Sequence, residues 1–192
     1  MIGRLVRFLS QPHTLFLYLS LLFGAIFLVI TAPMRAPDER GHLYRIIELS
    51  QGKLVGNAKL DLHTMEYMDA WFDARFGKQS HFAYAVRDWW IYDLKKEDRI
   101  GPVPYKAAKM YSPAAYLPAI PMVWLYNLTG LPPIGLIYLV RASFLLGAVV
   151  LLYHAIRITP FLKWQLCAVA LFPSTVFLRS SISADPLTTA YI

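Results

Sequence analysis

The sequence contains few charged residues and a single cysteine. Charged residues make up 16% of the 192 residues, whereas hydrophobic residues make up 57%. About a quarter of the residues in a soluble globular domain are charged, so this composition argues against an ordinary soluble protein. The only cysteine, Cys167, has no partner for a disulfide within the chain, and no Cys-x-x-Cys pair is present to bind zinc. The composition therefore predicts an integral membrane protein.

The net charge of +7 is not accompanied by a pattern typical of nucleic-acid binding. The basic residues form no cluster interleaved with aromatic residues, and their positions are better explained by the positive-inside rule. We expect membrane lipid as a partner and no nucleic acid.

The first long apolar run covers residues 14–32 and follows Arg4 and Arg7. It contains no charge and is long enough to cross a hydrocarbon core of about 30 Å. A cleaved signal peptide is the competing interpretation, but its apolar region is usually only about 7–15 residues long. In addition, Ala32-Pro33-Met34 is a poor cleavage site. The run therefore predicts a retained helix, with the N-terminus in the cytoplasm and the next segment outside.

Two further apolar stretches, 134–156 and 164–182, are joined by the short link 157–163. Arg157 and Lys163 favour a cytoplasmic position for this link. The segment 112–133 is also largely apolar, but prolines at 113, 118 and 121 disfavour a regular spanning helix. We expect it to lie at the interface or to re-enter the membrane; if it crossed instead, the basic link would face outward.

The predicted fold class is an all-α membrane protein with about three transmembrane helices and a large outer loop that carries amphipathic juxtamembrane helices. The predicted segments are a cytoplasmic N-terminus (1–13), a transmembrane helix (14–32), an extracytoplasmic loop (33–111), an interfacial or re-entrant segment (112–133), a transmembrane helix (134–156), a cytoplasmic link (157–163), a transmembrane helix (164–182) and an outer end (183–192).

Within the outer loop, the spacing of apolar residues predicts two helices. The pattern Pro37-Asp38-Glu39 is typical of a helix start with Asp38 as the N-cap, and Gly52 is a plausible stop. A second amphipathic segment runs from Leu62 to Phe76. Both helices are expected to rest on the membrane surface.

The start of the first loop helix also carries the residues best suited to chemistry. At about 100° per residue, Asp38, His42 and Arg45 share one stripe, whereas Glu39 turns toward the side of Ile46. One carboxylate could therefore act as a base or a metal ligand while the other supports it. The alternative is that Asp38 only caps the helix and that Glu39 only favours its dipole.

A series of motifs in the chain resembles a known family. The motifs are Pro37-Asp38-Glu39, Gly41-His42-Leu43-Tyr44-Arg45, Glu48-Leu49-Ser50-Gln51-Gly52-Lys53-Leu54, Tyr111-Ser112-Pro113, Tyr116-Leu117-Pro118, Leu139-Val140-Arg141 and Ser183-Ala184-Asp185. In this order they resemble the domain-of-unknown-function family 2142 of bacterial multi-pass membrane proteins. The resemblance implies a location in the plasma (bacterial inner) membrane. Family members are usually much longer, so we expect this sequence to be an N-terminal part of one.

That family is similar in layout to the C-type glycosyltransferases, which use polyprenyl-phosphate-linked sugars. The similarity implies that Asp38 and Glu39 are the catalytic acids, as a base for the acceptor or as ligands of a divalent metal ion; the sequence does not determine the cofactor. The residues expected to contact substrate are His42, Arg45, Lys106, Lys109, Arg141 and Asp185. A transporter or a scaffold for cell-envelope polysaccharide assembly, which catalyses nothing, is the alternative function.

Several of these candidates have a structural alternative. Lys106, Lys109 and Arg45 could simply anchor the chain at the interface. Arg141 lies inside a predicted span, where a charged residue contacts a phosphate or forms a buried pair. Arg179 is near the outer end of the last span and is expected to extend to the membrane surface. Asp185 reaches the face of Asp38 only if the chain crosses three times.

Overall fold

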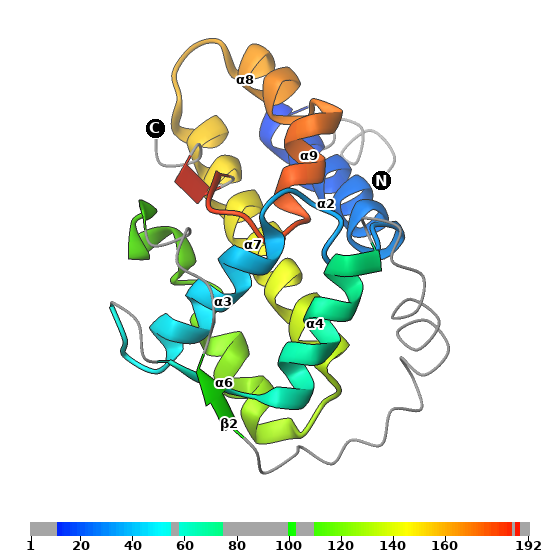
Figure 1. The fold of residues 1–192 in the computed structure, drawn as a ribbon. Coiled ribbons are helices and arrows are strands. Elements are labelled where there is room, and N and C mark those ends of the chain that lie inside the picture. Colours follow the sequence, from blue (N-terminus) through cyan, green and yellow to red (C-terminus); the bar gives the residue numbers. More distant parts are fainter. Residues whose placement is uncertain (1–10, 55–57, 75–99, 103–109, 186, 189–192) are drawn as a thin grey trace.

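The computed structural model describes residues 11–54, 58–74, 100–102, 110–185 and 187–188. The part described is mostly helical, and α7 runs through the whole length of it (Figure 1). The predicted lysine contacts, Lys106 and Lys109, lie outside the described residues, as do Arg4 and Arg7.

Among the described residues, two helices are long and apolar enough to cross a membrane. They are α2 (Pro12–Ile30) and α7 (Pro133–Ile158). The helices are antiparallel: Gly24 of α2 faces Leu145 of α7, and the ring of His13, near the start of α2, contacts that of Tyr153, near the end of α7. Gly24 permits this close approach, because a Cβ atom there would lie 2.5 Å from Leu145 Cδ1.

The apolar stretch expected to form a third spanning helix is broken. It forms α8 (Lys163–Ala170) and α9 (Pro173–Arg179), which both pack against α2. The prediction of one continuous helix over 164–182 is wrong, because Pro173 has no N–H to donate and holds Phe172 in an extended conformation (φ −55°, ψ 137°). The hydroxyl of Thr175 donates to the carbonyl of Ala170, 3.0 Å away, and so satisfies a group that the break leaves free.

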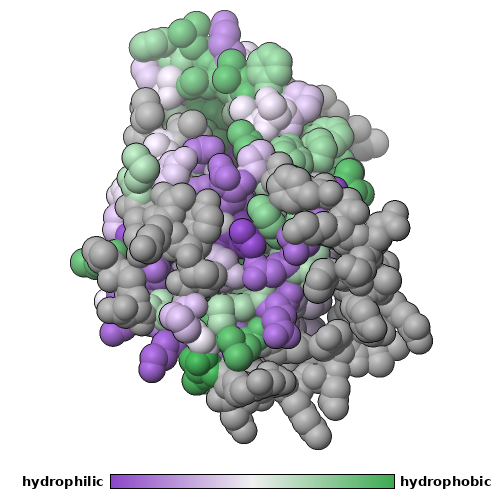
Figure 2. Space-filling model, viewed as in Figure 1, coloured by the Kyte–Doolittle hydropathy of each residue, from purple (hydrophilic) through white to green (hydrophobic). Residues whose placement is uncertain are grey.

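Side chains on these helices are suited to contact lipid. Large apolar side chains are exposed on α2, α7 and α8, among them Leu22, Val29, Val150, Trp164 and Val169. The upper part of the face shown in Figure 2, over α8 and α9, is mostly hydrophobic, whereas the middle of that face is hydrophilic. A monomeric soluble protein rarely exposes so much apolar surface, so this part of the chain favours a bilayer environment.

A second group of helices packs around the first turns of α7. These are α3 (Glu39–Ser50), α4 (Leu62–Ala74) and α6 (Ile120–Thr129), with a short 3-10 helix, η2, at Pro113–Tyr116. A two-stranded antiparallel sheet, which was not predicted, joins β1 (Lys59–Asp61) to β2 (Ile100–Pro102) beside α4. At ten residues, α6 spans only about 15 Å and is too short to cross the bilayer by itself.

Helix α3 starts and stops close to the predicted positions, but it does not lie on a surface. Its residues from Gly41 to Glu48 are all buried, although the sequence is rich in charge. The apolar side chains Leu43, Ile46 and Ile47 belong to the core shared with α6 and α7. The indole of Trp124 in α6 donates to the carbonyl of Ser50 at the end of α3, 2.9 Å away. The polar residues of α3 are therefore buried within the fold.

Candidate functional site

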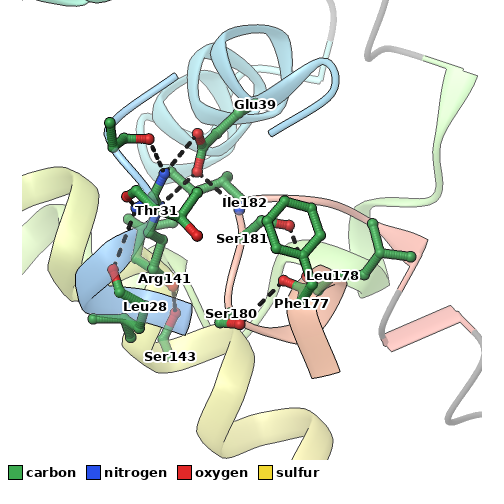
Figure 3. Close-up of polar contacts among 12 residues, drawn as sticks. Leu28, Thr31, Glu39, Arg141, Ser143, Phe177, Leu178, Ser180, Ser181 and Ile182 are labelled. Carbon is green, nitrogen blue, oxygen red and sulfur yellow. Dashed lines mark hydrogen bonds and ion pairs between the residues drawn. The ribbon is translucent and has the colours of Figure 1, made fainter. Parts of the chain in front are cut away.

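The two carboxylates at the start of α3 have different surroundings. Glu39 is buried and forms a two-pronged ion pair with Arg141 of α7, at 2.7 Å from Arg141 Nε to Glu39 Oε1 and 2.9 Å from Nη2 to Oε2 (Figure 3). Asp38 is exposed and takes a left-handed backbone conformation (φ 55°). Its side chain does not cap α3, so the predicted N-cap hydrogen bond is absent. Of the two carboxylates, only that of Asp38 is therefore accessible to solvent.

Arg141 uses all five of its N–H donors inside the protein. Besides Glu39, it donates to the carbonyls of Thr31 (2.6 Å), Ala32 (3.1 Å) and Leu28 (3.4 Å) at the end of α2 (Figure 3). A guanidinium has five N–H donors, so none remains for a phosphate oxygen. Of the two predicted roles for Arg141, this geometry favours the buried pair.

The same pair holds the segment after α9. Glu39 Oε1 also accepts a hydrogen bond from the backbone N–H of Ile182, 3.3 Å away (Figure 3). The end of α2, the start of α3, the middle of α7 and the chain after α9 thus meet at one ion pair. This contact brings Asp185, three residues beyond Ile182, to the side of the molecule that carries Asp38.

His42 occupies the middle of the predicted stripe. It is only 3% exposed, and its Nδ1 lies 2.7 Å from the hydroxyl of Tyr116. The ring of Tyr111 meets the His42 ring edge-on, with 5.0 Å between the ring centres. Burial lowers the pKa of His42, and burial likewise raises the pKa of Tyr116, so both groups are neutral at pH 7.

Three carboxylates act on His42. The charges of Asp185, Asp38 and Glu39 each raise its pKa, without overcoming the effect of burial. Asp38 and Asp185 are both exposed, whereas Glu39 is not. Three of the predicted site residues are therefore linked in the structure: the charges of Asp38 and Asp185 both act on the buried imidazole of His42.

Arg45 is buried rather than placed at a membrane surface. Its Nη1 donates to Glu48 Oε2 at 3.2 Å and to the carbonyl of Leu54 at 2.8 Å, and the residue is 4% exposed. Among the described candidates, neither Arg45 nor Arg141 is thus arranged as an open phosphate contact.

Arg179 differs from the prediction. It is 2% exposed, and its side chain reaches back along the bundle to the carbonyl of Ala170 and to the ring of Phe16, 5.4 Å from the guanidinium carbon. The expectation that it extends to the membrane surface is therefore wrong: its side chain is directed into the bundle.

The carboxylates do not form a ready metal centre within the part of the chain that is described. In that part, no group of three or more histidine, cysteine, aspartate or glutamate side chains is arranged to hold a metal ion. The surroundings of Asp38 suit proton transfer, because its carboxylate is accessible to solvent and its charge acts on the neutral His42, which is hydrogen-bonded to Tyr116.

Comparison with known families agrees with this architecture. The predicted membrane protein family DUF2142 matches residues 21–192, which is almost the whole chain. The chain belongs to DUF2142. No curated protein and no solved structure matches it. As a member of DUF2142 it is a predicted membrane protein, and two of its helices are candidate spans.

Two features of this DUF2142 chain were missed from the sequence. Tyr116 was noted only as part of a motif, yet it is the hydrogen-bond partner of His42. The segment that carries Tyr116 is separated from His42 by 74 residues, so no local spacing reveals the contact. The inward orientation of Arg179 was not predicted, although an arginine inside an apolar segment is by default a candidate for a functional role or a buried pair.

Proposed function

We propose that this chain is part of a membrane-embedded glycosyltransferase-like protein that acts on a polyprenyl-phosphate-linked sugar at the outer face of the bacterial inner membrane. The observation that supports the proposal is that the charges of two exposed acids, Asp38 and Asp185, both act on buried His42, at the end of α3 that adjoins α2. Exposed acids near the end of a candidate span would suit a reaction between a lipid-borne sugar and its acceptor at the membrane surface.

In this proposal Asp38 is the general base. The acceptor hydroxyl gives its proton to the Asp38 carboxylate as its oxygen bonds to the anomeric carbon of the sugar. The bond between that carbon and the phosphate oxygen breaks, and the polyprenyl phosphate leaves with the electron pair. His42 and Tyr116 are both neutral and hydrogen-bonded to each other, and they form one side of the proposed site. Asp185 supplies a second carboxylate.

Glu39 has a positioning role in this proposal. Its ion pair with Arg141 fixes the first turn of α3, and with it the backbone of Asp38, against the end of α2. This differs from the role of direct partner to Asp38 that the sequence suggested, because both Glu39 oxygens already accept hydrogen bonds.

The decisive experiment replaces Asp38 by Asn in the full-length protein. Asn has the same size and tolerates the left-handed backbone, so the fold is retained. A general base contributes about 10²–10⁴-fold to rate, and transfer from a polyprenyl-phosphate sugar by the purified protein should fall by that factor. Glu66→Gln, at an exposed position of α4, removes the same charge away from the site and should leave transfer unchanged.

Retained transfer by Asp38→Asn would reject the assignment of Asp38. If the purified wild-type protein consumes no polyprenyl-phosphate sugar at all, the alternative of a non-catalytic transporter or scaffold for polysaccharide assembly is favoured. The buried ion pair of Glu39 and Arg141 would serve such a protein equally well, because it only joins helices.

A further inference from the structure

A cavity lies between α7, α8 and α9, away from Glu39 and Arg141. Its volume is about 250 Å³. Its wall is largely apolar, with Leu152 and Ile156 from α7, Leu166 and Val169 from α8, and Leu178 from α9. Several of these residues belong to the part of the molecule that favours lipid, so the cavity is suited to a hydrocarbon chain.

Arg179 also lines this cavity, and its side chain is not satisfied there. One nitrogen, Nη2, donates to the carbonyl of Ala170, and the guanidinium stacks over Phe16. The other two nitrogens, Nε and Nη1, are buried and have no hydrogen-bond partner. Within the described residues, no acidic side chain forms an ion pair with Arg179.

This arrangement contrasts with that of Arg141 in the same bundle. Arg141 is equally buried, but all of its donors are used by Glu39 and by the carbonyls of α2. An arginine remains charged in proteins, and burying its charge without partners is strongly destabilising. The unmet donors of Arg179 therefore indicate an anionic group that comes from outside the described chain.

We propose that this cavity binds an anionic amphiphile, with a phosphate held by Nε and Nη1 of Arg179 and the adjoining hydrocarbon chain against α7 and α8. A guanidinium is well suited to this because two neighbouring N–H groups match two phosphate oxygens. This site goes beyond the proposed function, because Phe16 is in the first turns of α2, whereas the site around Asp38 adjoins the other end of that helix.

The volume of the cavity limits the size of the ligand that it can hold. At about 250 Å³ it is smaller than a typical drug-binding pocket, so it holds a phosphate and the first part of a chain rather than a whole lipid. Asp185 lines the same cavity and is exposed, and its charge also acts on His42. Asp185 thus connects the cavity with the site around Asp38.

The test measures ligand-dependent melting of the full-length protein in a nonionic detergent with three probes. Farnesyl phosphate carries both the anion and the chain, farnesol only the chain, and inorganic phosphate only the anion. We expect a concentration-dependent rise in melting temperature with farnesyl phosphate. Farnesol and inorganic phosphate at equal concentrations should give little or none.

Variants then locate the effect. Arg179→Gln removes the charged donors and should weaken the apparent affinity for farnesyl phosphate about tenfold to a hundredfold. Arg157→Gln removes the same charge at an exposed position near the end of α7 and should bind like the wild type. If Arg179→Gln does not fold, Ala155→Phe provides a second probe, because it retains Arg179 and fills the cavity where the chain would lie.

Equal stabilisation by farnesol, or equal binding by the Arg179→Gln or Ala155→Phe variant, would overturn the proposal. If inorganic phosphate stabilised the protein as strongly as farnesyl phosphate, the site would bind a free anion rather than a lipid, and the proposal would be overturned too. The result is independent of catalysis. If farnesyl phosphate binds through Arg179 while Asp38→Asn still transfers sugar, the lipid-phosphate site is supported and the proposed base is rejected. If farnesyl phosphate does not bind through Arg179 but Asp38→Asn loses transfer, only the lipid-phosphate site is rejected.

Discussion

Glu39 and Arg141, 102 residues apart in the sequence, form an ion pair from which solvent is excluded on both sides. Each oxygen of Glu39 accepts from a different nitrogen of Arg141. Because the remaining donors of Arg141 bind carbonyls at the end of α2, this pair fixes two candidate spans and the first turn of α3 to one another.

Breaking this pair from one side should be costly. Glu39→Gln leaves the buried charge of Arg141 without a counter-ion, and Arg141→Met does the same to Glu39. Either change should lower the free energy of unfolding by about 3–5 kcal/mol. Denaturant unfolding in mixed micelles measures this change.

The double variant Glu39→Gln/Arg141→Met provides the control for that prediction. It removes both charges together and should lose less stability than the sum of the two single changes, because no unpaired charge is left. If the decreases in unfolding free energy of the two single variants simply added up, the ion pair between Glu39 and Arg141 would not be supported.

The state of His42 predicts a pH dependence. Burial lowers its pKa below the value of about 6.5 for an unfolded chain, so the unfolded state binds a proton more readily than the folded state. The stabilising contribution is complete above pH 6.5 and is lost as pH falls through the folded pKa. Stability should therefore drop by up to about 1.4 kcal/mol per pH unit over this interval, as thermal unfolding from pH 7.5 to pH 5 would measure.

A His42→Gln variant separates this effect from the titration of other groups. Glutamine keeps a hydrogen-bonding group near Tyr116 but does not titrate. Its stability should vary less with pH over the same interval than that of the wild type. Identical pH profiles would mean that His42 titrates alike in the folded and unfolded states.

The close contact of α2 and α7 makes Gly24 sensitive to substitution. In Gly24→Ala the new methyl group would lie 2.5 Å from Leu145 Cδ1, so the Leu145 side chain or the helices must move. The atom that it meets is at the end of a flexible side chain, and we expect a loss of about 1–3 kcal/mol in unfolding free energy. Leu145→Ala removes the atom that the new methyl group meets, so Gly24→Ala should cost less on that background than in the wild type, whereas an equal cost would place the strain elsewhere.

The number of crossings can be tested by labelling. On a Cys167→Ser background, cysteines introduced at Asp38 and Asp185 should both react with a membrane-impermeant maleimide added to intact spheroplasts. A cysteine at Arg157, at the opposite end of α7, should react only after the membrane is opened. Protection of the cysteine at position 185 from the external reagent would reject the three-crossing topology.

The sequence predicted those elements that depend on local pattern. The spans 14–32 and 134–156 correspond closely to α2 and α7, and Pro37-Asp38-Glu39 marks the start of α3, because hydropathy and helix-start residues are local properties. Hydropathy alone hid the break at Pro173, since an interrupted helix is as apolar as a continuous one. Pro173 itself is a local signal for such a break.

The site was predicted less completely than the helices. The stripe of Asp38 and His42 followed from helical spacing, but the partners of His42 and Glu39 come from segments 74 and 102 residues away. A single sequence holds no information on such distant pairs. The burial of α3 was missed for the same reason, because its charges are compensated by residues that only the fold brings close.

Arg141 is level with the end of α2, so only the part of α7 from Arg141 to Ile158, about 26 Å long, remains to cross the bilayer beside α2. A helix adjusts to a thinner or thicker bilayer by changing its tilt. Since Arg141 also holds Glu39, a change in tilt would shift the first turn of α3 and with it Asp38. The position of Asp38 would thereby depend on the thickness of the membrane in which the protein resides.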